Sequence, residues 1–219
     1  MKKFFVNFAI AALVISTAFS SCNKDDNEST NMTVSGTIYS ADLPGWSKVG
    51  VSFDEGKTIE KIVPINDGKF TIGLPTPSAN QLGESDDIID DIEEMPSNFT
   101  VSEKKVRGVG AQFFVLDANG NEKAQIFLIA ANSDLLTKTA TVETAGWIFV
   151  DKNVDIKGSE DNEESEIALS SSVDLKLKKG WNTILVSVIF AETEWSAVIK
   201  TASAPSGAVW MVIDPDDEE

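Results

Sequence analysis

The chemistry open to this chain is limited by two of its residue types. Its 219 residues include no histidine and a single cysteine, Cys22. Histidine triads, histidine-bound zinc and imidazole acid–base catalysis are therefore excluded. Carboxylate pairs and Ser–Lys dyads remain, and Ser102 and Lys105 have the Ser-x-x-Lys spacing, but the partner motifs of such enzymes are absent. The sequence favours a protein that is not an enzyme, with a carboxylate-dependent hydrolase as the less favoured alternative.

Oxygen-bearing side chains offer a candidate cation site in the second half of the chain. Asp151, Asn153 and Asp155 have the one, three, five spacing that opens an EF-hand calcium loop. The pattern then fails, because Ile156 occupies the glycine position and Asn162 the position of the closing glutamate. A tight turn is the favoured interpretation. No cofactor is expected, and calcium is kept as an alternative.

Five tryptophans point to another chemistry, the stacking of sugar rings on exposed indoles. Trp46 and Trp181 each follow a glycine, so both are expected at turns and are candidates for ligand contact. The alternative for both is that an aromatic side chain at a turn folds back and closes the end of a sandwich. Trp147 and Trp210 lie in apolar runs and are expected in the core, whereas the place of Trp195 is left open.

Residues 1–21 have the layout of a secretory signal peptide. Lys2 and Lys3 precede an apolar stretch over residues 4–19, two serines follow, and Cys22 comes next. The stretch is short, and polar residues follow it at once, which is unlike a membrane-spanning helix. Cys22 has no partner for an intramolecular disulfide. We expect a lipid on Cys22, with Phe19 as a relaxed feature of the lipobox, and several acyl chains that anchor the protein to a membrane.

The residues that begin at Cys22 carry a resemblance. Cys22-Asn23-Lys24-Asp25-Asp26 resembles the start of lipoproteins of the Bacteroides group, in which a lysine followed by acids is similar to a surface-export signal. The resemblance implies that Lys24, Asp25 and Asp26 direct an outer-membrane lipoprotein to the cell surface. Residues 22–31 are polar throughout and are also expected to act as a flexible tether.

Residues 32–213 predict an all-β domain. Short runs of alternating apolar and polar residues are separated by turn signals, of which Asn66-Asp67-Gly68 is the strongest. The pattern predicts an antiparallel β-sandwich of immunoglobulin- or prealbumin-like type, as one domain or as two abutting modules that divide near residue 100. Residues 214–219 are an acidic tail. The strands expected in the second half are 106–116, 124–129, 146–156, 172–177, 183–190, 195–200 and 208–213.

Three short strings support this fold class. Val34–Ile38, Val49–Phe53 and Asp67–Ile72 resemble strands of the prealbumin-like or carboxypeptidase-regulatory-like sandwich modules of secreted bacterial proteins. The resemblance implies a structural or binding role and transfers no catalytic residue.

One acidic segment interrupts the strands. Residues 84–94 contain seven acids, Ser85 can cap a helix, and Pro96 would end it. Four apolar side chains in this segment fall at helical spacing. We expect a short amphipathic helix over residues 85–95, packed across an edge or end of a sheet, with calcium binding by its carboxylates as a less favoured alternative. The apolar positions are Ile88, Ile89, Ile92 and Met95.

The formal net charge of −17 argues against nucleic acid and anionic lipid headgroups as partners. Together these features predict a lipid-anchored cell-surface protein that binds a glycan or a protein without catalysis. A structural or assembly protein of the cell envelope is the alternative. The sequence leaves the oligomeric state open.

Overall fold

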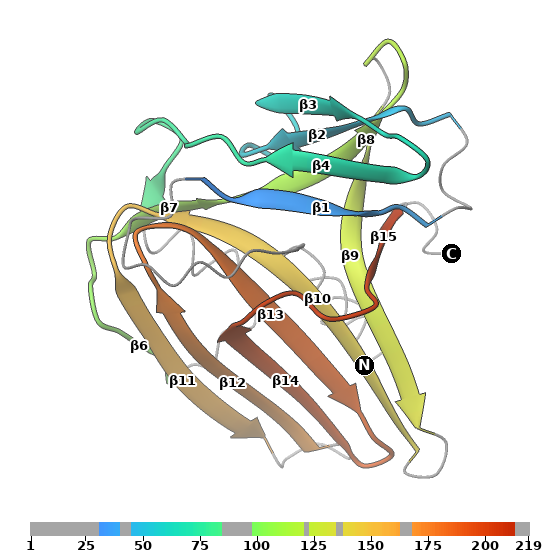
Figure 1. Ribbon diagram of the computed structural model, residues 1–219. Helices are drawn as coiled ribbons and strands as arrows, with labels where there is room; N and C mark the ends of the chain where they lie inside the picture. Colours follow the sequence, from blue (N-terminus) through green and yellow to red (C-terminus); the bar gives the residue numbers. More distant parts are fainter. Residues whose placement is uncertain are drawn as a thin grey trace.

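The structure, a computed structural model, describes residues 31–39, 45–84, 98–120, 123–134, 138–162 and 168–212 (Figure 1). Within these ranges the protein consists mostly of strands paired in sheets, and no helix occurs. The predicted all-β class is confirmed. The signal peptide, the tether up to residue 30, the helix expected over 85–95 and the acidic tail all lie outside the described residues.

Fifteen strands form two sheets in the described part of the chain. β1 and β4 pair as a two-stranded sheet. The other thirteen strands belong to one large sheet of order β3-β2-β8-β9-β10-β13-β14-β12-β11-β6, in which β15 pairs with β9, and β7 with β10 and β5. The strands are β1 (Thr33–Thr37), β2 (Lys48–Ser52), β3 (Lys61–Pro64), β4 (Lys69–Gly73), β5 (Gly83–Glu84), β6 (Thr100–Val101), β7 (Arg107–Gly110), β8 (Gln112–Leu116), β9 (Lys123–Asp134), β10 (Thr139–Val150), β11 (Val154–Asn162), β12 (Ala168–Leu177), β13 (Gly180–Phe190), β14 (Glu194–Thr201) and β15 (Val209–Val212).

The turn between β3 and β4 lies where the sequence predicts it. Asn66 and Lys69 exchange two backbone hydrogen bonds, of 2.8 and 2.9 Å. Asp67 and Gly68 between them have φ angles of 49° and 73°. Positive φ at both central residues defines the tight hairpin turn for which Asp-Gly is well suited. The turn carries the chain from the large sheet to the two-stranded sheet.

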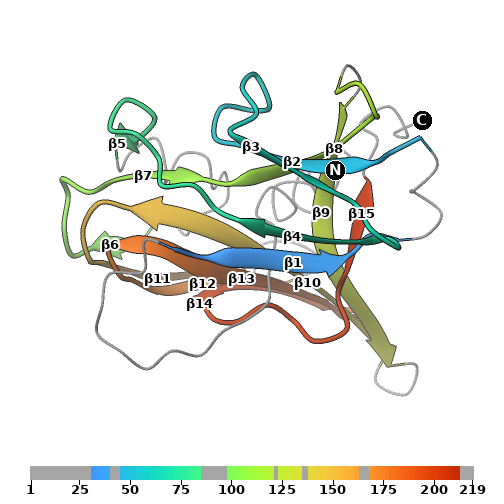
Figure 2. The same cartoon turned by 45° about the horizontal axis from the view of Figure 1, so that its top comes forward.

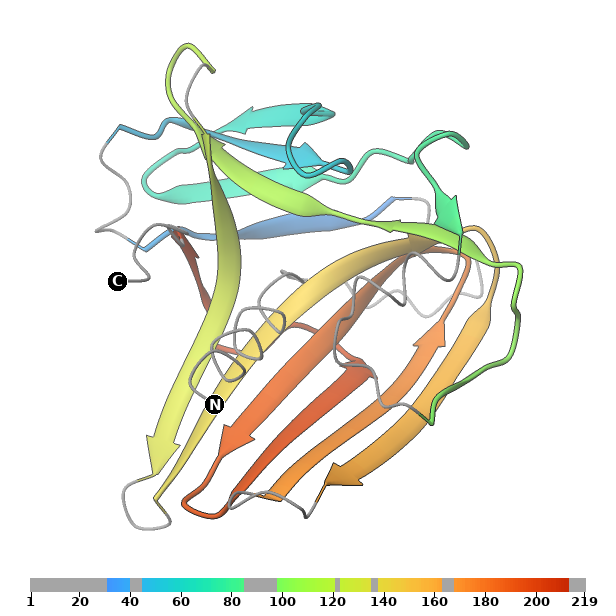
Figure 3. The ribbon, with the colours of Figure 1, turned by 180° about the vertical axis from the view of Figure 1, so that it is seen from behind.

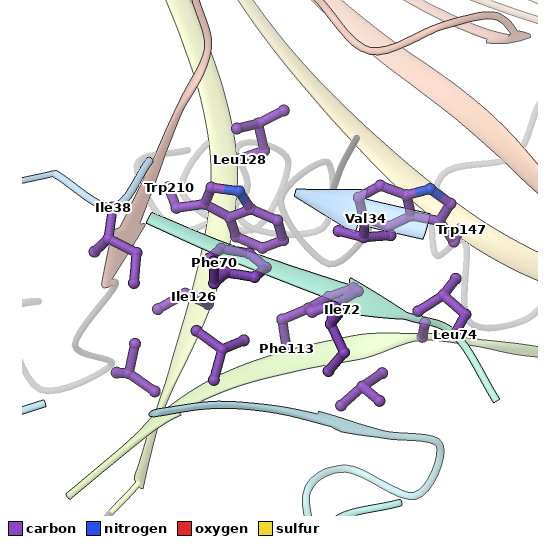
Figure 4. Close-up of a cluster of buried hydrophobic side chains, with 14 of the residues drawn as sticks. Val34, Ile38, Phe70, Ile72, Leu74, Phe113, Ile126, Leu128, Trp147 and Trp210 are labelled. Atoms are coloured by element: carbon purple, nitrogen blue, oxygen red, sulfur yellow. The ribbon is translucent and has the colours of Figure 1, made fainter. Parts of the chain in front are cut away.

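The two-stranded sheet packs on the upper part of the large sheet, so that the two layers enclose a core (Figure 2). Four aromatic rings lie at its centre: Phe70, Phe113, Trp147 and Trp210 (Figure 4). Phe113 contacts both tryptophans, with ring centroids 5.2 Å from Trp147 and 5.0 Å from Trp210. Only 2% of Trp147 and none of Trp210 is exposed, so the core positions predicted for both are confirmed. We call these four residues the aromatic cluster.

The large sheet runs unbroken from the first half of the chain to the second. β2 precedes residue 100 and pairs with β8, which follows it. The long strand β9 then pairs with β8 and β15 near its start and with β10 near its end (Figure 3). The described strands on the two sides of residue 100 therefore share one sheet.

One pair of neighbouring strands in the large sheet is parallel, unlike the fully antiparallel pairing that the sequence pattern predicts. β12 and β14 run in the same direction, with Ser170 opposite Ser196 and Val173 opposite Ile199. The cause is the strand order, because β13 and β14 form an antiparallel hairpin whose second strand lies between β12 and β13. The chain must cross the end of β14 on its way from β12 to β13.

Candidate functional site

Tyr39 and Trp46 each lie one residue from a backbone hydrogen bond to the hairpin of β3 and β4, at one end of the two packed layers. Tyr39 follows Ile38, whose backbone N–H donates to the carbonyl of Gly68 in that turn at 2.8 Å. Trp46 precedes Ser47, whose carbonyl accepts a 2.9 Å hydrogen bond from the N–H of Ile65, just before the same turn. We call this region, Tyr39, Trp46 and the turn Asn66–Lys69, the aromatic end.

The two aromatic side chains of this end differ in how far they are packed. Tyr39 is 47% exposed, whereas Trp46 is partly buried and packs against the core. A partly packed indole offers a ligand an apolar surface, and an exposed phenol offers it a hydroxyl group to bind. Sequence reasoning missed Tyr39, although the alternation of β1 places it on the polar side of the strand. Tyr39 is the only tyrosine in the chain, and this was the signal that could have marked it as a candidate for ligand contact.

Trp181 does not lie on the surface, so it lacks the exposed ring that a ligand contact at this candidate position would need. Its side chain is 2% exposed, and its Nε1–H donates to the carbonyl of Pro75 at 3.2 Å. Its ring packs against Phe53 and Phe149, with centroids 5.6 and 5.5 Å away. Trp181 thus fills the core from the start of β13, which is the alternative that the sequence left open for an aromatic residue at a turn. Trp195, the undecided one, is partly buried with its ring 4.9 Å from that of Phe190.

Two residues of the calcium hypothesis, Asp151 and Asn153, lie in the short connection between β10 and β11, and Asp155 lies near the start of β11. The Asp151 carboxylate accepts hydrogen bonds from the backbone N–H of Arg107 at 2.9 Å and from its Nε at 3.3 Å. The Asn153 side-chain oxygen accepts from the backbone N–H of Lys179 at 2.8 Å, and the Asp155 side chain is exposed. Calcium here would have to compete with a guanidinium for Asp151. Across the described residues, no group of three or more acidic, cysteine or histidine side chains is placed to hold a metal ion.

Ser102, from the Ser-x-x-Lys match, stabilises the backbone of this same region. Its hydroxyl accepts a 2.8 Å hydrogen bond from the N–H of Asp155, and its own N–H donates to the Asp155 carbonyl at 3.0 Å. Lys105 follows in the same loop, and its carbonyl accepts a hydrogen bond from the Nζ of Lys152 at 2.8 Å. These contacts anchor the chain before β7 to the start of β11.

A second acidic group, Asp54, organises the loop after β2. Its carboxylate accepts hydrogen bonds from the N–H of Thr58 at 2.7 Å and from the hydroxyl of Ser52 at 2.8 Å. The hydrogen bond from Thr58 is the main cause that lowers the pKa of Asp54 below its ordinary value of 3.8. In the same loop, the hydrogen bond to Glu55 raises the pKa of Lys57. Both shifts favour the charged forms, as expected of groups that hold a loop in place.

The residues that bear on export lie outside the part of the chain that the structure describes. Cys22, Lys24, Asp25 and Asp26 all fall within residues 1–30. Among the described ranges, no helix has the length and apolar character needed to span a bilayer.

Comparison with known proteins adds no family: the chain matches no family model, no curated protein and no solved structure.

Proposed function

We propose that this protein is a cell-surface lipoprotein, anchored to the outer membrane through acyl chains on Cys22 and exported by Lys24, Asp25 and Asp26. The two packed layers then form an immunoglobulin- or prealbumin-like sandwich, extended by strands β10–β14 and by a short helix over residues 85–95. The domain acts by binding a glycan or a protein rather than by catalysis. Calcium at Asp151, Asn153 and Asp155 stays a prediction and has no part in the binding.

The observation that carries the binding role is the aromatic end. Tyr39 is exposed, Trp46 is partly packed, and both flank the same turn. Tyrosine and tryptophan side chains lose little conformational freedom on binding because each has only two side-chain torsions, which is why aromatic residues dominate binding surfaces. A glycan is the favoured ligand because a sugar ring presents an apolar face for stacking and hydroxyl groups for hydrogen bonds.

The alternative, a structural or assembly protein of the envelope, requires a strand edge that can accept another chain. β3 is the edge of the large sheet, and it exposes Ile62. However, Pro64 has no N–H to donate, and the Lys61 side chain reaches across to the carbonyl of Gly73 at 2.9 Å. At the opposite edge, β6 pairs only with Ile156 and Lys157 of β11, and β11 ends in exposed acidic residues that include Asp161. Proline and charge at strand edges oppose strand addition, so this role is second.

Trp46→Ala and Tyr39→Ala test the binding role. Each is expected to weaken binding to a glycan-array ligand about tenfold or more, because removal of a central aromatic contact commonly has that effect. The readout is array binding followed by titration of the strongest glycan. Ile62→Ala is the matched control, since it removes an exposed apolar side chain from β3 instead. Binding that all three variants retain unchanged would exclude the aromatic end as the binding site, and partner chains that co-purify without any glycan signal would favour the envelope role.

A further inference from the structure

The sheet formed by β10–β14 has one strongly apolar side, which we call the apolar face. Alternate residues of each of the five strands point to this side and are at least nine-tenths buried. On β11, β12 and β14 the opposite side carries exposed charged residues such as Lys200 and the cross-strand ion pair of Lys157 with Asp174, at 3.4 Å, whereas Phe149 of β10 and Trp181 of β13 face the core that contains the aromatic cluster. The apolar face comprises Ile148, Val150, Val154, Ile156, Val173, Leu175, Leu177, Ile184, Val186, Val188, Ala197 and Ile199.

Few described side chains from outside the five strands pack against this face. In the described ranges, three apolar residues do so: Phe99, Val101 and Val106. All three lie between β5 and β7 in the sequence. Phe99 and Val101 lie in or next to β6, which pairs with β11, and Val106 directly precedes β7. They are too few to bury twelve apolar residues on five strands, because each buried side chain typically touches six or more others.

The buried part of the face is a band about one helix wide. Two or three alternate positions are buried on each strand, and alternate positions lie about 7 Å apart, so the band is about 7–13 Å wide. A helix with its side chains is about 10–12 Å across. Beyond the band, Val142, Phe190 and Leu169 on the same side are only partly buried.

The described residues that flank segment 85–97 lie on opposite sides of this band. Glu84 pairs with Arg107 on β7, which itself pairs with the upper end of β10. At the other end, the Cα of Phe99 lies 2.7 Å from where a Cβ on Gly158 of β11 would be, so the returning chain lies directly against β11. Phe99 also packs against the apolar face, so the chain returns on that side of the sheet.

The length of the connection fits the width that it must span. From β7 to β11 there are five strand-to-strand steps, through β10, β13, β14 and β12, which amount to about 24 Å. An eleven-residue helix over 85–95 is about 16 Å long, and the three residues after it add about 10 Å when extended. In a helix over these residues, the spacing of Ile88, Ile89, Ile92 and Met95 would put them on one side and Asp90 and Glu94 on the other.

We propose that residues 85–97 dock on the apolar face of β10–β14, with Ile88, Ile89, Ile92 and Met95 against the sheet and the acidic side in solvent. The face is thus an internal interaction surface whose partner is a segment of the same chain. With this docking, the acidic segment completes the core on the apolar face. The aromatic end stays free for a ligand.

Cysteine labelling of the full-length protein tests the orientation. Ile92→Cys and Ile89→Cys are expected to react with a maleimide about tenfold or more slowly than Asp90→Cys and Glu94→Cys in native buffer, because reaction requires local opening. In concentrated denaturant all four are expected to react at the same rate. The unsubstituted protein gives the background from Cys22. Equal rates for the inward and outward pairs in native buffer would overturn the proposal.

Cross-linking tests the docking site itself. A short bismaleimide is expected to join Ile92→Cys to Ile199→Cys within one chain, and to leave Ile92→Cys unlinked to Val198→Cys on the opposite side of β14. Cross-links that join two chains would mean that a second copy covers the face. A fatty acid recovered at one molecule per chain, with Ile92→Cys freely reactive, would mean that a ligand covers it. Either of these results would overturn the proposal.

Discussion

Gly36→Ala is expected to lower the free energy of unfolding by about 3 kcal/mol, because the new methyl group would overlap a buried ring. A Cβ at Gly36 would lie 2.1 Å from Nε1 and 2.4 Å from Cδ1 of Trp210. Trp210 is fully buried and is held by the other members of the aromatic cluster, Phe70, Phe113 and Trp147. Neither the ring nor β1 can move aside without disturbing the core. Urea denaturation, with the midpoint and slope compared with those of the unsubstituted protein, measures the loss.

Two further variants separate this overlap from the general effect of replacing glycine. Gly110→Ala, at an exposed glycine with no atom within 4 Å of its Cβ position, is expected to change stability by no more than about 0.5 kcal/mol. Trp210→Phe removes the overlapped Nε1, which has no hydrogen-bond partner, so Gly36→Ala should cost at most about half as much in that background. Similar losses for Gly36→Ala and Gly110→Ala would contradict the close packing of β1 on Trp210.

Asn182→Leu is expected to lower the free energy of unfolding by about 3 kcal/mol as well. Asn182 stabilises the turn by which the chain passes from β12 to β13 across the end of β14. Its side-chain amide donates to the carbonyls of Lys178 at 2.7 Å and Gly180 at 2.9 Å. Its oxygen accepts from the N–H of Lys178 at 2.8 Å, and the residue is 7% exposed. Leucine has a similar volume but leaves these backbone groups unpaired, and an unpaired buried group costs about 1–3 kcal/mol.

A second asparagine, which binds the same turn from the connection between β10 and β11, supplies the control for this prediction. The exposed Asn153 accepts one hydrogen bond, from the backbone N–H of Lys179. Asn153→Ala should therefore lower the free energy of unfolding by about 1 kcal/mol or less. Asn182→Asp keeps the acceptor but sets a carboxylate oxygen against the carbonyls of Lys178 and Gly180, so its loss of stability should be at least as large as that of Asn182→Leu. Unfolding followed by circular dichroism ranks the variants, and an Asn182→Leu protein as stable as Asn153→Ala would show that the side chain does not hold the crossing.

The fold class and its local signals could be predicted because they depend on neighbouring residues. The Asp67-Gly68 turn and the alternation on each side of it lie within one hairpin, and the structure has both where the sequence places them. Trp147 and Trp210 lie in apolar runs, which identifies a buried position without knowledge of the partner. β15 likewise occupies Val209–Val212, within the strand expected over residues 208–213.

What depends on distant pairing could not be predicted. The strand expected over 146–156 is two strands, β10 and β11, which lie at different places in the sheet, with β13, β14 and β12 between them. The parallel pair of β12 and β14 follows from a crossing that no local pattern encodes. Trp181 has polar neighbours and a glycine before it, as an exposed turn residue would, but its ring points to Phe53 and Phe149 from other strands. In the aromatic end, Trp46 was a candidate from sequence, whereas Tyr39 is related to it only because residues next to each bind the hairpin of β3 and β4.

The most direct test of the proposed function is the location of the protein in its native host. Cells grown with a fatty-acid probe and then treated with protease should yield labelled protein that is removed from intact cells. A Cys22→Ala variant should lose the label, and a variant with Lys24, Asp25 and Asp26 replaced by alanine should keep the label but resist the protease. Unlabelled wild-type protein would contradict the lipid anchor, and labelled protein that resists protease in both forms would contradict the surface location and favour a role inside the envelope.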